Sequence, residues 1–265
     1  MINQKYSLGT TFVKMTHPSY FQKHTLVKND FSDSIKDKRI ISLSPGGFKG
    51  FYVLGICKYI KKNYNLDNYV FSGASAGAWN SLLLCYKGSI DEIQENIIDN
   101  SLQNTKSIKD LENLIIKRIL TKYNAENFDL NKLFIGVTTL NDYKTNTTIY
   151  SNFSNLEDAL NCCMASSHIP LVTGGLVNVY RNVLSFDGGF SKYPYLNTSN
   201  AVLHITPSMW VSNPEKRKKE SSMKITDYTT LFSKEKYHFI DMIENGFKDS
   251  ERNKHILDSI FLKED

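Results

Sequence analysis

The chain has 265 residues, of which 41% are hydrophobic and 12% aromatic, and its formal net charge at pH 7 is +5. This length and apolar content fit one sizeable α/β domain and exclude wholesale disorder. The positive charge is mild and spread along the chain, which permits attraction to anionic surfaces without indicating a nucleic-acid binder. We therefore predict no nucleic-acid partner.

Strand-like and helix-like segments alternate in the first part of the chain. Arg39–Ser44 is a short β-branched run that ends at Pro45-Gly46-Gly47, which predicts a buried strand. Helical spacing of apolar residues follows over Phe51–Lys62, and then come a strand-like run at Tyr69–Ser72 and a helix-like run at Ala76–Tyr86. This order predicts a βαβ unit with a parallel sheet, in which the loops after both strands emerge at the same edge.

The rest of the chain continues the mixed pattern. Further helices are expected at Ser89–Asn100, Ser107–Lys122 and Leu156–Met164. Further strands are expected at Leu133–Leu140, Thr147–Tyr150, Leu176–Tyr180, Val183–Phe186 and Ala201–Ile205. A basic loop at Lys216–Lys219 precedes a polar helical tail that starts at Lys224. We expect an N-terminal lead-in at residues 1–38, a core at residues 39–206, and an extension at residues 207–265 packed on the same domain.

Membrane, metal and redox signatures are missing from the sequence. No apolar run approaches the roughly 20 residues that span a bilayer, and residues 1–15 lack the apolar stretch of a secretion signal. The four cysteines (Cys57, Cys85, Cys162 and Cys163) have no metal-ligand spacing, and the six histidines form no HxH or HExxH pair. We therefore expect reduced thiols in a cytoplasmic protein, with membrane contact restricted to the periphery and no metal or organic cofactor.

Gly73-Ala74-Ser75-Ala76-Gly77 matches the pattern G-x-S-x-G between a predicted strand and a predicted helix. In that context a sharp turn holds the serine in a strained conformation and projects its hydroxyl from the end of the sheet. The flanking glycines leave room for neighbouring backbone, and the amides that begin the helix face any negative charge that forms near Ser75. Ser75 is therefore a candidate nucleophile, and an ordinary small-residue turn is the alternative.

A second glycine-rich loop, Pro45-Gly46-Gly47-Phe48-Lys49-Gly50, is expected at the same sheet edge as Ser75. Glycines can turn successive amides toward one point, so Gly46 and Gly47 together with the Ala76 amide would form an oxyanion hole. The loop lacks the full G-x-G-x-x-G pattern of dinucleotide sites and the G-K-[ST] of phosphate-binding loops. A nucleotide site is therefore disfavoured.

A serine hydroxyl needs a base. Asp187 lies in Ser185-Phe186-Asp187-Gly188-Gly189 at the end of a predicted strand and is the candidate proton acceptor, and a tight acid–glycine turn is the alternative. His204, His238 and His255 follow Asp187 in the chain and leave open the Ser–His–Asp triad of an α/β-hydrolase. We expect His204 to be a core residue of its strand and the other two histidines to lie on the surface.

Together these three segments resemble the patatin-like phospholipases, which join a glycine-rich oxyanion loop, a G-x-S-x-G serine and an Asp-Gly-Gly turn in this order. The resemblance runs from about Ile40 to about Leu196 and includes Ala165-Ser166-Ser167-His168-Ile169-Pro170. It implies a three-layer α/β sandwich with a mainly parallel central sheet. It also implies hydrolysis of the carboxylic esters of membrane lipids, of the phospholipase A or lysophospholipase type, on phospholipids or other fatty-acyl esters, through an acyl-enzyme.

The resemblance also implies residue roles. Ser75 would be the nucleophile and Asp187 the proton acceptor of a catalytic dyad. Gly46, Gly47 and Ala76 would hold the oxyanion. Residues that would support the motifs are Lys49, Gly50, Gly73, Gly77, Gly188 and Gly189.

One position departs from the family pattern. Pro45 stands where the family's first loop glycine would be, and proline has no N–H to donate. This departure leaves open a catalytically inactive membrane-binding or interaction module, in which the basic run Lys216–Lys219 would meet anionic lipid. The segment Ser89–Tyr123, whose helices interrupt the sheet-forming part of the chain, is a candidate lid. The sequence does not indicate whether the protein is a monomer or an oligomer.

Overall fold

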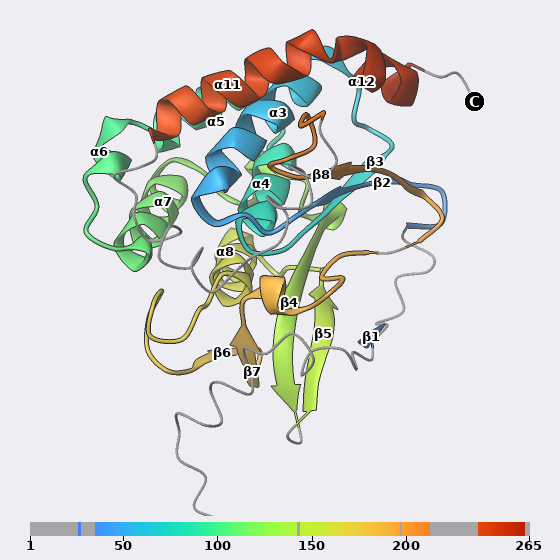
Figure 1. Cartoon of the computed structure of the whole chain (residues 1–265). Coiled ribbons are helices and arrows are strands. Elements are labelled where there is room, and N and C mark those ends of the chain that lie inside the picture. Colours follow the sequence, from blue (N-terminus) through green and yellow to red (C-terminus); the bar gives the residue numbers. More distant parts are fainter. Residues whose placement is uncertain (1–25, 28–34, 142–143, 197, 213–237, 263–265) are drawn as a thin grey trace, which may run out of the picture.

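The computed structural model of the chain describes residues 26–27, 35–141, 144–196, 198–212 and 238–262 (Figure 1). Most of the predicted N-terminal lead-in, the basic run Lys216–Lys219 and the predicted helical start at Lys224 lie outside these residues.

The described strands form one mixed sheet. Its eight strands are β1 (Leu26–Val27), β2 (Arg39–Leu43), β3 (Tyr69–Gly73), β4 (Leu133–Asn141), β5 (Lys144–Tyr150), β6 (Asn178–Tyr180), β7 (Val183–Phe186) and β8 (Ala201–Ile205). The strand order is β1-β5-β4-β3-β2-β8, and β7 pairs with both β4 and β6. Because β4, β3, β2 and β8 run parallel, the carboxyl ends of β2 and β3 lie at one edge of the sheet.

Several of the described helices begin at a polar side chain that caps their first turn. The described helices include α3 (Gly50–Asn63), α4 (Ala76–Leu84), α5 (Ile90–Ile97), α6 (Asn100–Gln103), α7 (Ile108–Lys122), α8 (Leu156–Ser166), α11 (Phe239–Arg252) and α12 (Lys254–Phe261). The side chains of Ser89, Ser107 and Asn155 each accept a hydrogen bond from a backbone N–H of the following first turn. Such caps satisfy N–H groups that have no partner within the helix.

The main hydrophobic cluster lies between the sheet and the helices α3, α4 and α8. Helix α3 is apolar around most of its circumference because α11 covers its outer side (Figure 1). In the described residues α11 therefore packs outside α3, on the side away from the sheet. On the opposite face of the sheet, Ile40, Val70, Phe134 and Ile149 form a smaller cluster with Ile35 and Leu196.

These observations confirm the predicted α/β class and the mainly parallel central sheet. The differences from the predicted elements are at their ends. The strand predicted from Thr147 begins at Lys144, because β5 pairs with β4 as far as the Asn141–Lys144 pair of a tight hairpin. The helix predicted over Ser89–Asn100 ends at Ile97, and a separate short helix, α6, follows. The division of the chain at residues 38 and 206 stays a prediction.

Close backbone contact joins α11 to α3. A Cβ on Gly246 of α11 would lie 2.0 Å from the carbonyl oxygen of Tyr52, and a Cβ on Gly55 of α3 would lie 2.0 Å from that of Ile243. Phe239, at the start of α11, stacks on Phe51 with ring centroids 4.1 Å apart. Helix α11 therefore packs on α3 through two positions that only glycine fits.

We expect Gly246→Ala to destabilise the protein by about 1–3 kcal/mol, because the added methyl group forces α11 away from α3. Helix propensity alone would make the variant more stable by about 1 kcal/mol, because alanine is the better helix former. A loss of stability would therefore indicate the close packing of the two helices. Urea unfolding monitored by circular dichroism would measure the change. Asn245→Ala, at the exposed neighbouring position, is the control. A Gly246→Ala variant as stable as the control would contradict the close packing.

Candidate active site

Ser75 occupies a strained turn between β3 and α4. Its backbone has φ 53° and ψ −127°, a conformation that non-glycine residues rarely adopt. The turn is also crowded, since a Cβ on Gly77 would lie 2.2 Å from the carbonyl oxygen of Leu43. The motif glycine is therefore required for the close approach of α4 to the end of β2. Ser75 lies directly before the N-terminus of α4, whose first amides favour nearby negative charge.

The structure brings Ser75 and Asp187 into direct contact. Ser75 Oγ donates a hydrogen bond of 2.8 Å to Asp187 Oδ2, and the Gly189 amide donates one of 2.6 Å to Oδ1. Both side chains are buried, with 6% of each residue exposed. The Asp187 amide in turn donates to the carbonyl oxygen of His168 at 2.8 Å, which fixes the start of the Asp-Gly-Gly turn.

Burial perturbs the acidity of Asp187. Desolvation raises the pKa of this carboxyl from 3.8 to about 6, and the hydrogen bonds from Ser75 and Gly189 oppose the rise only in part. A carboxylate with this pKa is mostly ionised at neutral pH and is a better proton acceptor than a free aspartate.

The Ser166 hydroxyl connects the Ser75 turn to β4 by two hydrogen bonds. It accepts a hydrogen bond from the Ser75 amide at 2.8 Å and donates one to the carbonyl oxygen of Gly136 at 2.6 Å. This bridge ties the turn to the end of α8 and to the middle of β4. The role was not predicted from the sequence, where Ser166 appeared only as part of the segment Ala165–Pro170.

The glycine-rich loop forms a short 3-10 helix, η2 (Gly47–Lys49), beside Ser75. Gly47 has φ 52°, in the left-handed region that favours glycine. Gly50 leaves room for Ala76, since a Cβ on Gly50 would lie 2.7 Å from the Ala76 methyl carbon. Among the described residues, no recorded hydrogen bond uses the amide N–H of Gly47 or Ala76. Their place as oxyanion donors stays a prediction.

The other predicted loop residues have separate surroundings. Gly46 lies next to Pro207, and Lys49 is half-buried in η2; neither is among the residues that line the pocket around Ser75. Pro45 packs beside the Asp187 turn, where a Cβ on Gly189 would lie 3.2 Å from its Cβ. Gly188 is buried in that same turn, against Ala74 and the backbone of Gly136.

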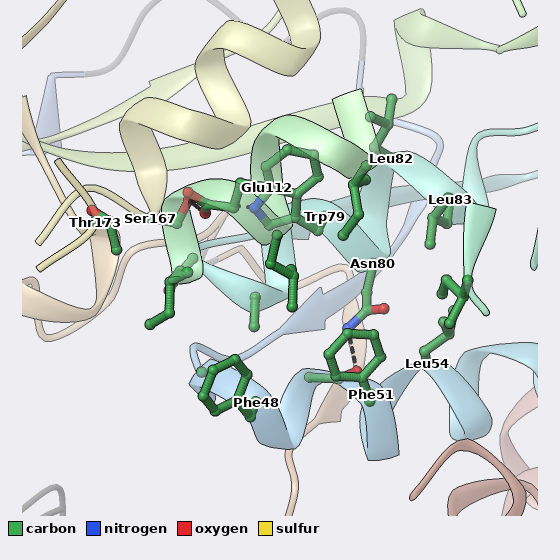
Figure 2. Close-up of a pocket in the computed structure, with 18 of the residues that line it drawn as sticks. Phe48, Phe51, Leu54, Trp79, Asn80, Leu82, Leu83, Glu112, Ser167 and Thr173 are labelled. Atoms are coloured by element: carbon green, nitrogen blue, oxygen red, sulfur yellow. Dashed lines mark hydrogen bonds between the residues drawn. The ribbon is translucent and has the colours of Figure 1, made fainter. Parts of the chain in front are cut away.

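A mainly apolar pocket opens next to Ser75 and Asp187 (Figure 2). Its walls come from η2, α3, α4, the end of α5, α7 and the segment that follows α8. The aliphatic and aromatic lining consists of Phe48, Phe51, Leu54, Trp79, Leu82, Leu83, Ile97, Ile98, Ile108, Leu111, Ile115, Ile119 and Ile169. The segment Ser89–Tyr123 thus supplies one wall of the pocket, and its role as a lid stays a prediction.

Residues 41–196 match the family model of the patatin-like phospholipases. The match covers more than half of the chain and spans the loop after β2, the Ser75 turn and the Asp187 turn. The chain belongs to the patatin-like phospholipase family. A search of the curated proteins gave no significant match. Membership confirms the resemblance stated from the motifs and indicates a lipid acyl hydrolase.

Within the described residues, the Ser75 hydroxyl is hydrogen-bonded to Asp187 and not to a histidine. The expectation that His204 is a core residue was wrong, because β8 is an edge strand and leaves His204 exposed, with a ring nitrogen 2.8 Å from Ser42 Oγ. His238 and His255 are exposed, as expected.

Two further properties of the described residues concern metal binding and the crossing of a membrane. The described residues contain no group of three or more histidine, cysteine, aspartate or glutamate side chains placed to hold a metal ion. None of the described helices combines the length and the apolar character needed to cross a bilayer.

Sequence reasoning missed a polar group in the apolar pocket. Glu112 of α7, Ser167 at the end of α8 and the indole N–H of Trp79 on α4 meet in its wall (Figure 2). The three residues lie far apart in the chain, and Glu112 follows Leu111 in a helix that otherwise reads as ordinary amphipathic sequence. No local pattern could have indicated their contact.

We expect Asp187→Asn to stabilise the protein at pH 8 by an amount on the order of 1–3 kcal/mol. The folded pKa of about 6 lies above the ordinary 3.8, so the ionised carboxylate opposes folding at high pH. The difference should shrink as the pH falls through 6 toward 4, where Asp187 is protonated in the folded state. Thermal unfolding at several pH values would measure it.

Asp37→Asn is the matched control, because this carboxyl is exposed and its loss should give no such pH-dependent gain. Equal destabilisation by Asp187→Asn at pH 5 and pH 8 would contradict the conclusion that desolvation of the carboxylate dominates.

Proposed function

We propose that this chain is a lipid acyl hydrolase of the phospholipase A or lysophospholipase type that uses Ser75 and Asp187 as a catalytic dyad. The observation that carries the proposal is the 2.8 Å hydrogen bond from the Ser75 hydroxyl to the buried Asp187 carboxylate, at the wall of an apolar pocket. Family membership supports the lipid ester as substrate. The strained backbone of Ser75 supports its role as nucleophile.

In the proposed first step, Ser75 Oγ attacks the ester carbonyl carbon while Asp187 accepts the hydroxyl proton. The resulting oxyanion accepts hydrogen bonds from the Gly47 and Ala76 amides, because both residues line the pocket beside Ser75. Gly46, which the family resemblance also suggests, stays a predicted donor. Asp187 then returns the proton to the leaving alcohol, and the acyl group remains on Ser75.

In the second step, water gives a proton to Asp187 and attacks the acyl-enzyme. The fatty acid leaves, and the proton returns to Ser75. The same carboxylate therefore serves as base and acid in turn, which a pKa near 6 suits at neutral pH. The apolar pocket walls fit a fatty-acyl chain, whose burial there is favourable at roughly 0.8 kcal/mol per CH₂ group.

We expect Ser75→Ala and Asp187→Asn each to lower fatty-acid release by at least about 100-fold, because each removes one half of the proton transfer. For the wild type, kcat/KM should rise with pH through an apparent pKa near 6, because Asp187 accepts a proton only when ionised. Release of fatty acid from phospholipid and lysophospholipid micelles, with and without chelator, is the measurement.

Two sets of variants separate this proposal from its alternatives. Activity that survives in His204→Ala, His238→Ala and His255→Ala excludes the Ser–His–Asp triad. A folded but silent wild type that gains activity on Pro45→Gly would identify Pro45 as a disabling residue and favour the inactive binding module.

We also propose peripheral contact with a lipid surface through the loop between α8 and β6. Leu171, Leu176 and Val177 in this loop are 70%, 53% and 60% exposed. Leu171 has φ 66°, an unusual conformation for leucine, and its amide donates to the carbonyl oxygen of Gly175 at 3.3 Å. Ile169 and Thr173 of the same loop line the pocket. A membrane that met these apolar side chains would therefore lie next to the pocket.

We expect the double variant Leu176→Ser, Val177→Ser to bind phospholipid vesicles at least about 10-fold more weakly, since two exposed apolar side chains lose their contact with lipid. Hydrolysis of a soluble short-chain ester should stay unchanged. Leu262→Ser, which removes a leucine of similar exposure (61%) at the end of α12, is the control. Vesicle sedimentation would test the proposal, and equal binding by both variants would contradict it.

A further inference from the structure

Glu112 is a buried carboxyl group in the wall of the apolar pocket that holds Ser75 and Asp187. It is 5% exposed, and its neighbours along α7, Leu111 and Ile115, line the same pocket (Figure 2). A carboxyl group in such surroundings is unfavourable unless its oxygens have hydrogen-bond partners. Its partners therefore indicate what the pocket is built to bind.

Only one of the two carboxyl oxygens is paired within the described protein. Glu112 Oε1 lies 2.5 Å from Ser167 Oγ, which also accepts a hydrogen bond from Trp79 Nε1 at 3.3 Å. Ser167 Oγ lies 2.9 Å from the carbonyl oxygen of Cys163 as well. Glu112 Oε2 is fully buried and has no hydrogen-bond partner among the described residues.

The protonation state of Glu112 decides which hydrogen joins it to Ser167. Ser167 has one hydroxyl hydrogen and two neighbouring acceptor oxygens, on Glu112 and on Cys163, and the Cys163 oxygen also accepts the Ser167 amide. If Glu112 is protonated on Oε1, it donates to Ser167, and Ser167 donates to Cys163. Burial raises the pKa of Glu112 to about 8; the hydrogen bond with Ser167 opposes this rise, and the charge of Asp187 adds to it. Glu112 is then neutral at pH 7, and Oε2 is a carbonyl-type acceptor.

We propose that Glu112 Oε2 binds a hydroxyl group of the substrate, so that this hydrolase prefers acyl esters that carry a free hydroxyl close to the scissile bond. This inference rests on the proposed function. A neutral acceptor suits a neutral O–H donor, whereas phosphate and ester oxygens carry no hydrogen to donate. The hydroxyl and the ester would lie in the same part of the pocket, because Glu112 contacts Ser167, whose neighbour Ser166 accepts a hydrogen bond from the Ser75 amide.

Two sources of such a hydroxyl exist. One is the leaving alcohol, as in the free glycerol hydroxyl of a lysophospholipid. The other is the acyl chain, as in a hydroxy fatty acid. An ester that lacks the hydroxyl leaves Oε2 buried and unpaired, and we expect it to react with a kcat/KM lower by roughly 10- to 100-fold.

The experiment compares two matched pairs of esters in the same detergent micelles. The first pair is a 1-acyl lysophosphatidylcholine and its 2-deoxy analogue. The second is the ethyl ester of a long-chain fatty acid and the same ester with a hydroxyl near the carboxyl end of the chain. Wild type should prefer the hydroxylated member of one pair by at least about 10-fold, and that pair identifies the source of the hydroxyl.

Two variants of Glu112 separate recognition from structure. Glu112→Gln places an NH₂ group against Ser167 and keeps a carbonyl oxygen at the position of Oε2, so it should retain the preference. Glu112→Met has a similar shape and no acceptor of comparable strength, so it should lose or reverse the preference. A purely structural role of Glu112 would lower kcat/KM for both members of a pair equally and leave the ratio unchanged.

The outcomes distinguish this inference from the proposed function. Ser75-dependent turnover without a preference in either pair, or a preference that persists in Glu112→Met, would overturn the hydroxyl site alone. No Ser75-dependent turnover of any of the four esters would overturn the proposed function and the hydroxyl site with it. Circular dichroism of each variant confirms that it is folded before its ratios are compared.

Discussion

The burial of the Asp187 carboxylate is the constraint on which the site depends. Among the residues that the structure describes, two donors face this group, the Ser75 hydroxyl and the Gly189 amide, and they do not offset the loss of water. The carboxylate therefore opposes folding at neutral pH and, for the same reason, is a stronger base than an aspartate in water. The surrounding fold must hold it in place, which it does through the His168 carbonyl oxygen and through Pro45 beside the turn. Strain at Ser75 adds a second local instability at the same point.

The sheet and its connections supply the rigidity that these strained groups need. Parallel pairing of β2 with β3 brings the glycine-rich loop and the Ser75 turn to one edge, as expected of a βαβ unit. The antiparallel pairing of β7 with β4 carries Asp187 to that edge from more than 100 residues further along the chain. Ser166 then links the Ser75 turn to β4 and α8. The strands β3, β4 and β7 and the helix α8 thus fix the positions of the Ser75 and Asp187 side chains.

Two carboxyl groups in one pocket have separate environments. Asp187 has a donor on each oxygen and an intermediate pKa, whereas Glu112 lies among aliphatic side chains with one oxygen paired and a pKa raised further. When the environments of two neighbouring acids give them different pKa values, the two acids commonly have different roles. In this chain the two pKa values suit an ionised base at Asp187 and a neutral hydrogen-bond acceptor at Glu112. Helix α7 therefore supplies both the apolar surface for an acyl chain and the one polar atom that distinguishes among substrates in our proposal.

The sequence by itself determined the features that depend on a few adjacent residues. The G-x-S-x-G turn, the glycine-rich loop, the Asp-Gly-Gly turn and the alternation of strands and helices were readable, because turn geometry and periodicity are local properties. Their order along the chain was enough to indicate the family. The tertiary structure alone decided that Ser166 supports the Ser75 turn, that Glu112 faces the pocket, and that His204 is exposed. Glu112 meets Ser167 across 55 residues and Ser166 meets Ser75 across 91. Contacts at such separations depend on how whole elements pack, and the pattern of a single helix or strand does not encode its partner.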